Sequence, residues 1–300
     1  MEKGSASVIN GTALAADITQ SLTKVIDSKE TQSKRPPCVA VLLVGDRKDS
    51  ATYVRMKRKK AEQIGIQFKL MQYPEDVSQP QLEHAIRSLN KDDVVDGIIV
   101  QLPLPAHIED GTVTGLVRPE KDVDGFQPAN VGNLVTVGCD TKRPYFVACT
   151  ARGVIRMIKQ TGKELRGALV VLVGTGMVGK PLALLLMRED ATVVCCNKST
   201  INIESLTRQA DIVVAACGVP RLVKGTWVKP GAVVIDVGIN SIIDPSRKSG
   251  RRLVGDVDYD EVSKKLGPEG WISPVPHGVG PMTVAMLMTA VVESWKRRIK

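Results

Sequence analysis

Lys57 is the residue whose type and position most strongly indicate acid–base chemistry. The sequence predicts a helix over residues 49–65, capped by Ser or Asp and ended by Gly65. At about 100° per residue, Lys57 falls on the apolar stripe of this helix, with Tyr53 beside it; the stripe is formed by Val54, Ala61 and Ile64. A lysine on an inward face is rare and can act as a proton shuttle. The alternative is a lysine that snorkels at the helix edge.

The second candidate is a glycine-rich loop, Gly-Thr-Gly-Met-Val-Gly, at residues 174–179. It follows an expected strand over 169–173 and precedes an apolar helix over 181–187. In such a loop the first Gly makes the turn, the second admits a pyrophosphate to the backbone, and the third lets helix and strand pack closely. The context predicts a dinucleotide site. The alternative is a tight turn in another kind of α/β protein.

The segment after the next strand bears on the choice of dinucleotide. It reads Asn197-Lys198-Ser199-Thr200 and holds no Asp or Glu. An NAD site usually places an acidic residue here, on the ribose hydroxyls. Lys198 and Ser199 could instead meet a 2′-phosphate, which favours NADP, although Lys198 could also be a solvated loop lysine.

Further polar residues lie where ligands bind in open parallel sheets, beyond the carboxyl ends of the strands. Gln101 directly follows an expected strand over 97–100, and a charged turn over 121–126 contains Asp122 and Asp124. Either carboxylate could accept hydrogen bonds from a heterocycle, and either could simply serve the turn. The Pro- and Gly-rich segment 274–283 precedes a helix and suits a close approach to a ligand or a rigid turn.

Short β-branched runs alternate with helical patterns, and together they position these residues. The expected strands cover residues 38–44, 97–100, 168–173, 192–196, 211–216 and 232–237. This alternation predicts an α/β fold with a parallel sheet and helices on its faces. The pattern restarts at Ala168, so residues 141–153 are interpreted as the crossing between two halves. A last helix, 282–298, has an apolar stripe and a basic end.

Composition limits the class of protein. A length of 300 residues corresponds to about two domains. Hydrophobic residues make up 43% and charged residues 24%, which excludes a disordered chain. The net charge of +9 with only 3% aromatic residues favours small anions over nucleic acid as partners, or indicates only a basic surface. The six Cys and three His are not clustered, so no metal site is expected. With neither a signal sequence nor a membrane-spanning stretch, we expect a cytosolic protein.

Six segments carry motifs of one known family. They are 53–57 (Tyr-Val-Arg-Met-Lys), 100–105 (Val-Gln-Leu-Pro-Leu-Pro), 121–125 (Lys-Asp-Val-Asp-Gly), 229–240, 254–257 and 274–288. In this order and over almost the whole chain, they resemble the bifunctional methylenetetrahydrofolate dehydrogenase/cyclohydrolase family. The resemblance implies an N-terminal α/β catalytic domain (1–150), to which the C-terminal helix (282–300) returns. It also implies a Rossmann-like NAD(P)-binding domain (151–281), a homodimer through that domain, and no nucleic-acid or membrane partner.

The resemblance implies a two-step reaction on tetrahydrofolate derivatives. 5,10-Methylenetetrahydrofolate is oxidised to the methenyl form with NADP, and water then converts the methenyl form to 10-formyltetrahydrofolate. Lys57 would be the acid–base group of the hydrolysis, tuned by Gln101, while Tyr53 would stack on the folate and Asp124 would hold the pterin. The other implied substrate contacts are Leu102, Pro276 and Gly278. The implied cofactor residues are Gly174, Thr175, Gly176, Gly179, Lys198, Ser199, Cys217, Gly218, Ile239 and Thr283.

The sequence departs from the family pattern mainly in the dinucleotide half. The usual Gly-Arg-Ser-x-x-Val-Gly-x-Pro loop is one residue shorter here and lacks the Arg and Ser. His277 replaces the first Gly of the usual Pro-Gly-Gly-Val-Gly-Pro-Met-Thr segment, and Ala148 and Ala151 replace the two prolines of Pro-Cys-Thr-Pro. Three alternatives therefore remain: a cyclohydrolase with weak or NAD-shifted dehydrogenase activity, a non-catalytic folate or nucleotide sensor, and an NAD dehydrogenase for another substrate.

Overall fold

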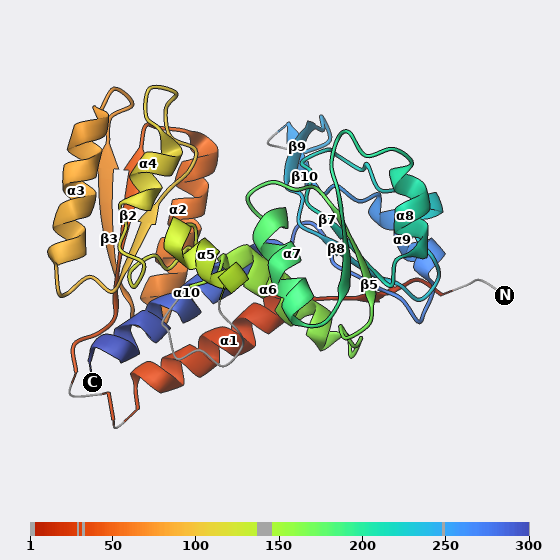
Figure 1. Ribbon diagram of the computed structural model, residues 1–300, viewed down its shortest axis with the longest axis horizontal. Helices are drawn as coiled ribbons and strands as arrows, with labels where there is room; N and C mark the ends of the chain where they lie inside the picture. The colour runs from red at the N-terminus through yellow and green to blue at the C-terminus, as the bar shows by residue number, and fades with distance from the viewer. Residues whose placement is uncertain (1–3, 29, 32–33, 137–145, 248–249, 300) are drawn as a thin grey trace. The chain divides into compact units, whose positions relative to one another are not determined.

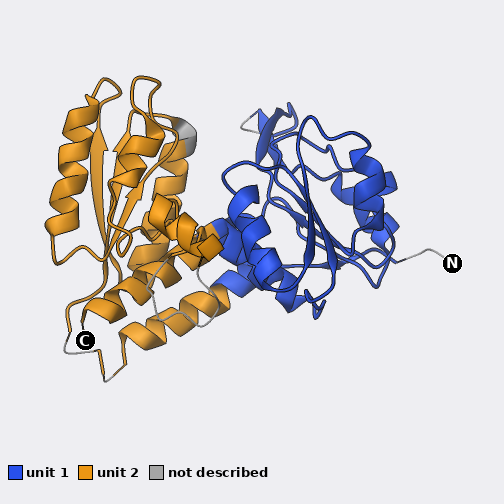
Figure 2. Cartoon of the chain, in the orientation of Figure 1, with its two compact units in different colours: residues 1–15, 150–283 blue, residues 16–149, 284–300 orange. Residues whose placement is uncertain are grey.

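The chain folds into two compact α/β units, as seen in a computed structural model (Figure 1). The structure describes residues 4–28, 30–31, 34–136, 146–247 and 250–299. Unit 1 comprises residues 1–15 and 150–283, and unit 2 comprises residues 16–149 and 284–300 (Figure 2). Each unit has its own parallel sheet, which confirms the α/β class predicted from the alternation of strands and helices.

Unit 2 is built on a three-stranded parallel sheet in the order β3-β2-β4. The strands are β2 (Cys38–Val44), β3 (Gln67–Tyr73) and β4 (Gly97–Val100). Every residue of β2 is buried. Because successive strand side chains point to opposite faces, Ala40 and Leu42 pack with Leu82 and Ile86 of α3 (Gln79–Lys91), while α2 (Lys48–Gln63) lies on the other face (Figure 1). The shorter helices are α4 (Asp110–Gly115) and α5 (Pro128–Thr136).

The last helix, α10 (Val279–Arg298), returns to unit 2. The indole Nε1 of Trp295 donates to the carbonyl of Arg35 at 2.8 Å, and Ser294 Oγ donates to the carbonyl of Asp96 at 2.7 Å. Trp295 is one of the largest fully buried side chains. The prediction that the C-terminal helix packs on the N-terminal domain is therefore confirmed. In Figure 1 the same unit shows α10 beside α1 (Gly11–Ile26).

Unit 1 contains a six-stranded parallel sheet in the order β1-β11-β8-β7-β5-β6. Its strands are β1 (Ser7–Val8), β5 (Leu169–Val173), β6 (Thr192–Cys196), β7 (Ile212–Ala215), β8 (Val233–Asp236) and β11 (Trp271–Ile272). One face packs against α9 (Tyr259–Leu266), α8 (Ile203–Gln209) and the 3₁₀ turn η1 (Gly225–Trp227). The helices α6 (Cys149–Gln160) and α7 (Gly179–Arg188) lie on the other side (Figure 1). A separate antiparallel ribbon joins β9 (Asn240–Ile243) to β10 (Arg251–Val254).

Three boundaries differ from those drawn from the sequence. Residues 1–15 lie in unit 1 because β1 pairs in parallel with β11, whereas the sequence-based boundary puts them in the N-terminal domain. Of the expected crossing, residues 141–145 lie outside the described part, and the rest from Cys149 begins helix α6. Helix α2 begins at Lys48 with Arg47 at its N-cap position, so the expected Ser or Asp cap was wrong.

Within the described residues, no helix is both long and apolar enough to cross a membrane.

Candidate functional site

Lys57 is buried and forms a hydrogen bond with one polar side chain of the neighbouring strand end. Its side chain is only 8% exposed. Its Nζ donates to Gln101 Oε1 at 3.1 Å, and the Gln101 amide nitrogen donates to the carbonyl of Leu102 at 2.9 Å. The second bond fixes the amide with its oxygen toward the lysine. The inward placement of Lys57 predicted from helical periodicity is confirmed.

The rest of α2 shows why Lys57 faces inward. Val54, Ala61 and Ile64 are all buried on the same stripe, and Arg55 and Lys59 are exposed. Tyr53 is half-buried one turn before Lys57, at the position expected for a ring beside the lysine. Gln101 is held in place because its backbone N–H donates to the carbonyl of Leu42, which continues the pairing of β4 with β2. The helix and the sheet thus bring Lys57 and Gln101 together from distant parts of the chain.

The two aspartates of the charged turn after α4 differ in burial and in hydrogen bonding. Asp122 is buried, and its carboxylate accepts hydrogen bonds from the backbone of Gly125 (3.1 Å) and Gln127 (2.8 Å) and from the Asn130 amide (2.8 Å). Burial raises the pKa of Asp122, and these hydrogen bonds oppose that rise. Asp124 is half-buried. Asp122 therefore serves the turn itself, and Asp124 is the carboxylate with an accessible surface.

Lys121 is a second buried lysine in this unit, and its partners are of a different kind. It is 2% exposed, and its Nζ donates to the carbonyls of Leu89 (2.9 Å) and Asp92 (2.7 Å) at the end of α3. Burial lowers the pKa of Lys121 to about 8. Its amine ties the turn to the helix end, and the periodicity of the sequence gave no indication of this role.

In unit 1 the glycine-rich loop borders a cavity of about 450 Å³. Gly174 has φ of +119°, a conformation that favours glycine, and a side chain at Gly179 would overlap the Gly174 carbonyl. Gly176 has open space where a side chain would stand. The loop therefore presents bare backbone to the cavity at the start of α7, as a pyrophosphate site requires.

The predicted cofactor residues separate into those that line this cavity and those that lie elsewhere in unit 1. The lining includes Gly174, Thr175, Gly176, Lys198 and Cys217. Lys198 and its neighbour Ser199 are exposed in the turn after β6. Outside the lining lie Ser199, Gly179, Gly218, the 46%-exposed Ile239, and Thr283, whose hydroxyl donates to Thr150 Oγ1 at 3.2 Å.

His277 has a backbone conformation that side chains rarely adopt. Its φ is +81°, the left-handed region that favours glycine. The ring is exposed and lies 3.4 Å from the Thr12 hydroxyl. Pro276 is exposed on one side of it, and Gly278 is buried against the carbonyl of Pro274 on the other. The residue that departs from the family pattern therefore stands in a backbone position suited to the usual glycine.

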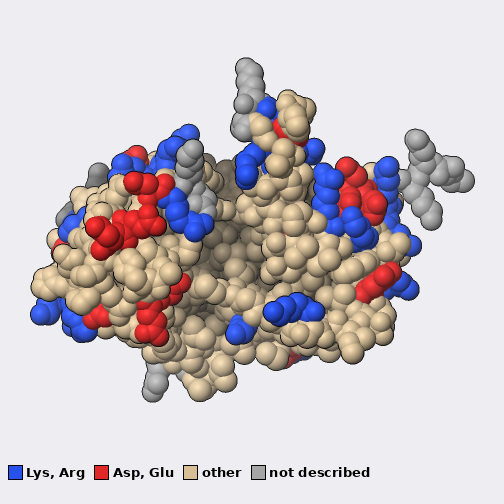
Figure 3. Space-filling view, turned by 90° about the horizontal axis from the view of Figure 1, so that it is seen from above, with Lys and Arg blue, Asp and Glu red and all other residues tan. Residues whose placement is uncertain are grey.

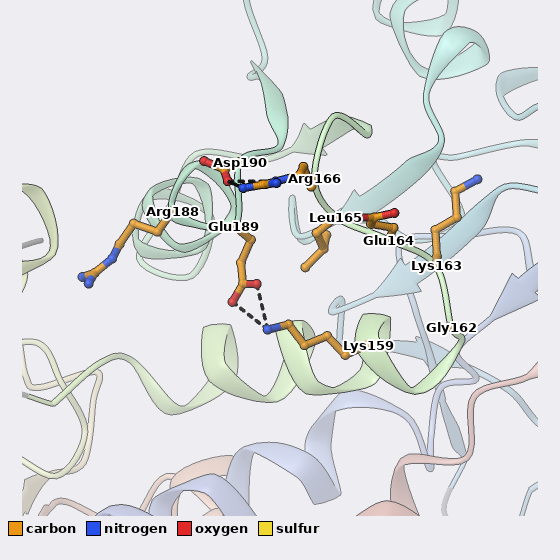
Figure 4. Close-up of a pocket in the computed structure, with 9 residues that line it drawn as sticks. All are labelled: Lys159, Gly162, Lys163, Glu164, Leu165, Arg166, Arg188, Glu189 and Asp190. Carbon is orange, nitrogen blue, oxygen red and sulfur yellow. Dashed lines mark hydrogen bonds and ion pairs between the residues drawn. The ribbon is translucent and has the colours of Figure 1, made fainter. Parts of the chain in front are cut away.

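A different hollow of unit 1, of about 400 Å³, holds a set of charges that neutralise one another (Figure 4). Lys159 pairs with Glu189 at 2.7 Å, and Arg166 pairs with Asp190 at 3.2 Å. Because these cations already have carboxylate partners, we place no ligand there. The face in Figure 3 likewise shows basic and acidic side chains interspersed in each unit. The described residues contain no group of three His, Cys, Asp or Glu able to hold a metal ion.

The described cysteines differ in exposure. Cys38, Cys149 and Cys196 are buried, Cys195 is exposed, and Cys217 is half-buried at the cavity. Burial raises the pKa of the Cys217 thiol to about 11. Cys139 lies outside the described residues.

Two buried aspartates of unit 1 were not predicted from the sequence. Asp236 is 3% exposed and Asp256 is fully buried. Burial raises the pKa of Asp236 to about 7, opposed by three backbone N–H donors. Both lie in motif segments, but nothing in their spacing distinguished them from ordinary turn residues.

Comparison with known proteins agrees with this geometry. Residues 148–299 match the model of the tetrahydrofolate dehydrogenase/cyclohydrolase NAD(P)-binding domain, and residues 9–124 match that of the catalytic domain. The chain is 45% identical over 293 residues to Bifunctional protein FolD 2 of Arabidopsis thaliana, covering 97% of this chain and 96% of that one. It is 46% identical to the chloroplastic FolD 4 of the same plant, covering 98% of this chain and 81% of that one.

The solved structures include a similar enzyme from Trypanosoma brucei. It is the N5,N10-methylenetetrahydrofolate dehydrogenase-cyclohydrolase complexed with NADP cofactor and an inhibitor. The two structures superpose with a TM-score of 0.92 at 41% identity, covering 99% of each chain. The fold and the glycine loop define a two-unit α/β protein with a dinucleotide-binding half. The chain belongs to the tetrahydrofolate dehydrogenase/cyclohydrolase family.

Proposed function

We propose that this chain is a bifunctional enzyme of one-carbon metabolism. It oxidises 5,10-methylenetetrahydrofolate to the methenyl form and hydrolyses that product to 10-formyltetrahydrofolate. The observation that carries the proposal is the buried Lys57 Nζ, 3.1 Å from Gln101 Oε1, in a chain of this family. A folate or nucleotide sensor has no need of a buried lysine held by a single side-chain acceptor, so that alternative is disfavoured.

Lys57, oriented by Gln101, performs the proton transfers of the hydrolysis. Water adds to the bridge carbon of the methenyl cation and loses one proton to give a neutral carbinol. The carbinol hydroxyl then loses its proton as the bond from that carbon to N5 breaks, N5 takes up one proton, and the N10-formyl product forms with net release of one proton to solvent. The Lys57 amine is the group that takes up and returns the proton. Gln101 accepts one amine hydrogen and so orients the remaining donor and lone-pair positions of Nζ. An amide suits this task because it orients the amine without adding a charge.

The folate ring system is assigned to the surface around this pair. Tyr53, half-buried next to Lys57, offers its ring for stacking. The accessible carboxylate of Asp124 accepts hydrogen bonds from the amino and ring N–H groups of the pterin. Leu102 supplies apolar contact.

The cavity beside the glycine loop fits a nicotinamide dinucleotide. Bare backbone at Gly174 and Gly176 and the start of α7 suit the pyrophosphate, and Lys198 suits a 2′-phosphate. When bound here, oxidised NADP would supply the hydride acceptor for oxidation of the folate bridge carbon. Lys198 and the absence of an acidic residue beside it favour NADP over NAD, and they disfavour an NAD dehydrogenase acting on another substrate.

One alternative has a specific observation in its favour. The phosphate loop lacks the Arg and Ser usual in the family, and Lys198 stands exposed at the rim of the cavity. A cyclohydrolase with weak or NAD-shifted dehydrogenase activity would fit these facts. Lys57, Gln101 and Asp124 would then retain their roles unchanged.

Product analysis tests the proposed function. The purified chain is incubated with 5,10-methylenetetrahydrofolate and NADP, and the folate products are separated while NADPH is followed by absorbance. We expect one NADPH for each methenyl or 10-formyl folate formed. Methenyl hydrolysis without oxidation would support the alternative, and the absence of both reactions would refute the proposal.

We also propose a homodimer formed through the NAD(P)-binding domain and a cytosolic location. Both are supported by family membership, and the relatives include a cytoplasmic protein. Relatives assigned to chloroplasts and mitochondria show that the family occupies several compartments. Sedimentation analysis and imaging of the tagged full chain would test the two proposals.

A further inference from the structure

Two motif segments, 229–240 and 254–257, each contain an aspartate to which no role is given above. Each carries a buried carboxylate, Asp236 or Asp256. A buried carboxylate is costly unless hydrogen bonds compensate for its lost hydration. The contacts of these two aspartates therefore show what their burial achieves.

Asp256 holds a turn that borders the nucleotide cavity. Its Oδ2 accepts hydrogen bonds from the backbone N–H of Cys217 (2.7 Å) and of Gly218 (2.9 Å). Its Oδ1 accepts from the Asn240 side-chain amide at 2.8 Å. The turn follows β7 and bends at Cys217, and Gly218 has φ of +70°, a conformation that favours glycine. Two successive N–H groups of this turn thus converge on one oxygen.

The same turn lies in close approach to the glycine-rich loop. A side chain at Gly174 would overlap the carbonyl oxygen of Ala216. In a trans peptide the C=O points away from the N–H of the next residue, so the bond from Cys217 N–H to Asp256 sets the direction of the Ala216 carbonyl. Ala216, Cys217 and Gly174 all line the cavity. Asp256 therefore fixes the spacing of two walls of that cavity.

Asp236 in turn fixes Asp256. Its carboxylate accepts the backbone N–H groups of Asp256 (2.9 Å), Val257 (2.9 Å) and Gly238 (3.0 Å). Asp236 is the last residue of β8, and its own N–H donates at 2.8 Å to the Oγ of Ser273, the residue after β11. This bond ties Asp236 to the paired strands β8 and β11. The sheet thus holds Asp236, Asp236 holds the backbone of Asp256, and Asp256 holds the turn.

Glycines leave the space that this arrangement needs. A side chain at Gly255 would overlap the Asp236 carboxylate, and one at Gly238 would overlap the Asp256 carboxylate. The two glycines and two aspartates therefore form one interlocked set. A set this tight restrains the backbone more than solvent-exposed turn contacts would.

We propose that Asp256, held by Asp236, is a positioning residue of the dinucleotide site: it fixes the turn at residues 216–218 against Gly174 and so sets the affinity for the nicotinamide cofactor. This inference rests on the proposed function, because it assigns the cavity to that cofactor. Asp256 does not line the cavity. It acts through the backbone of Cys217 and Gly218.

The test compares Asp256→Ala and Asp256→Asn with a matched control, Asp258→Ala. Asp258 lies two residues after Asp256 and pairs with Lys224 at 3.0 Å. Five quantities are measured on the full chain: the Kd for NADP by calorimetry, the KM for NADP, the kcat of the oxidation, the rate of methenyl hydrolysis without dinucleotide, and the melting temperature. Hydrolysis reports on the folate half independently of the cofactor.

We expect Asp256→Ala to raise the Kd and KM for NADP at least about tenfold, because two buried N–H groups lose their acceptor. The rate of hydrolysis should stay within about twofold of that of the unaltered chain. In the control the Kd, KM, kcat and rate of hydrolysis should also stay within about twofold, and the melting temperature should be unchanged. Asp256→Asn keeps one acceptor oxygen and should therefore raise the Kd and KM for NADP less than Asp256→Ala does. This variant keeps the proposal testable if the alanine variant does not fold. An unchanged Kd, or a parallel loss of both activities together with a lower melting temperature, would overturn the inference. If the unaltered chain binds NADP without oxidising folate, the proposed function fails while the Kd comparison still decides this inference.

Discussion

The two units of the molecule form their proposed sites from different chemical groups, a buried side chain in one and bare backbone in the other. In unit 2 the site depends on a buried lysine side chain, Lys57, with one side-chain acceptor, Gln101. In unit 1 the cavity beside Gly174 is shaped by bare backbone, and its predicted cation, Lys198, is exposed. Proton transfer needs one group at one position, whereas an extended dinucleotide can be held by many weak contacts. Single substitutions should therefore affect the two halves very differently.

Removing the Lys57 amine should have the largest effect. We expect Lys57→Ala to lower the rate of methenyl hydrolysis by about 10²–10⁴-fold, the usual contribution of a positioned acid–base group. The measurement is the decay of methenyl absorbance without dinucleotide. Lys59→Ala, an exposed lysine of the same helix, is the control and should stay within about twofold. A Lys57→Ala chain that kept more than half the rate would remove Lys57 from the mechanism.

Removing the exposed cation of the other half should have a moderate and selective effect. We expect Lys198→Ala to raise the KM for NADP about tenfold, since a charge-assisted contact with phosphate is lost, and to leave the KM for NAD unchanged. Lys265→Ala, exposed on α9, serves as the control. Equal changes for NADP and NAD would show that Lys198 does not recognise the 2′-phosphate.

Lys121 sharpens the contrast, because it is buried like Lys57 but bonds only backbone carbonyls. Its pKa is about 8 in the folded chain and 10.5 as the ordinary value. Between these values the unfolded chain binds more protons, so the free energy of unfolding should rise with pH, by at most about 1.4 kcal/mol per pH unit. Urea unfolding at pH 8 and pH 10 measures the rise. In Lys121→Met the free energy of unfolding should rise less between these two pH values. Equal rises in both chains would contradict a lowered pKa of Lys121 in the folded chain.

The smallest effect should come from His277, where the sequence departs from the family in a left-handed position. We expect His277→Gly to be more stable than His277→Ala by about 1 kcal/mol, because only glycine adopts this backbone without strain. Both variants lose the contact of the ring with Thr12, so the comparison isolates the backbone. Equal melting temperatures would show that the left-handed φ carries no cost.

The sequence predicted the elements better than the contacts between them. Helical periodicity placed Lys57 inward, and the glycine spacing placed the loop between β5 and α7, because both signals are local. The pairing of β1 with β11 brings together residues more than 260 positions apart and had no local signal. The same holds for Asp236 and Asp256, whose role depends on which N–H groups the fold brings to them. The choice between Asp122 and Asp124 came from resemblance, and burial supplied the physical reason afterwards.

The most direct test of the account is the initial rate of 5,10-methylenetetrahydrofolate oxidation with NADP and with NAD in parallel, followed by methenyl absorbance. The account predicts that the chain oxidises 5,10-methylenetetrahydrofolate. It also predicts a kcat/KM for NADP at least about tenfold above that for NAD, a difference of about 1.4 kcal/mol. Faster turnover with NAD would contradict the role given to Lys198. No turnover with either dinucleotide, alongside intact methenyl hydrolysis, would show that only the folate half is active.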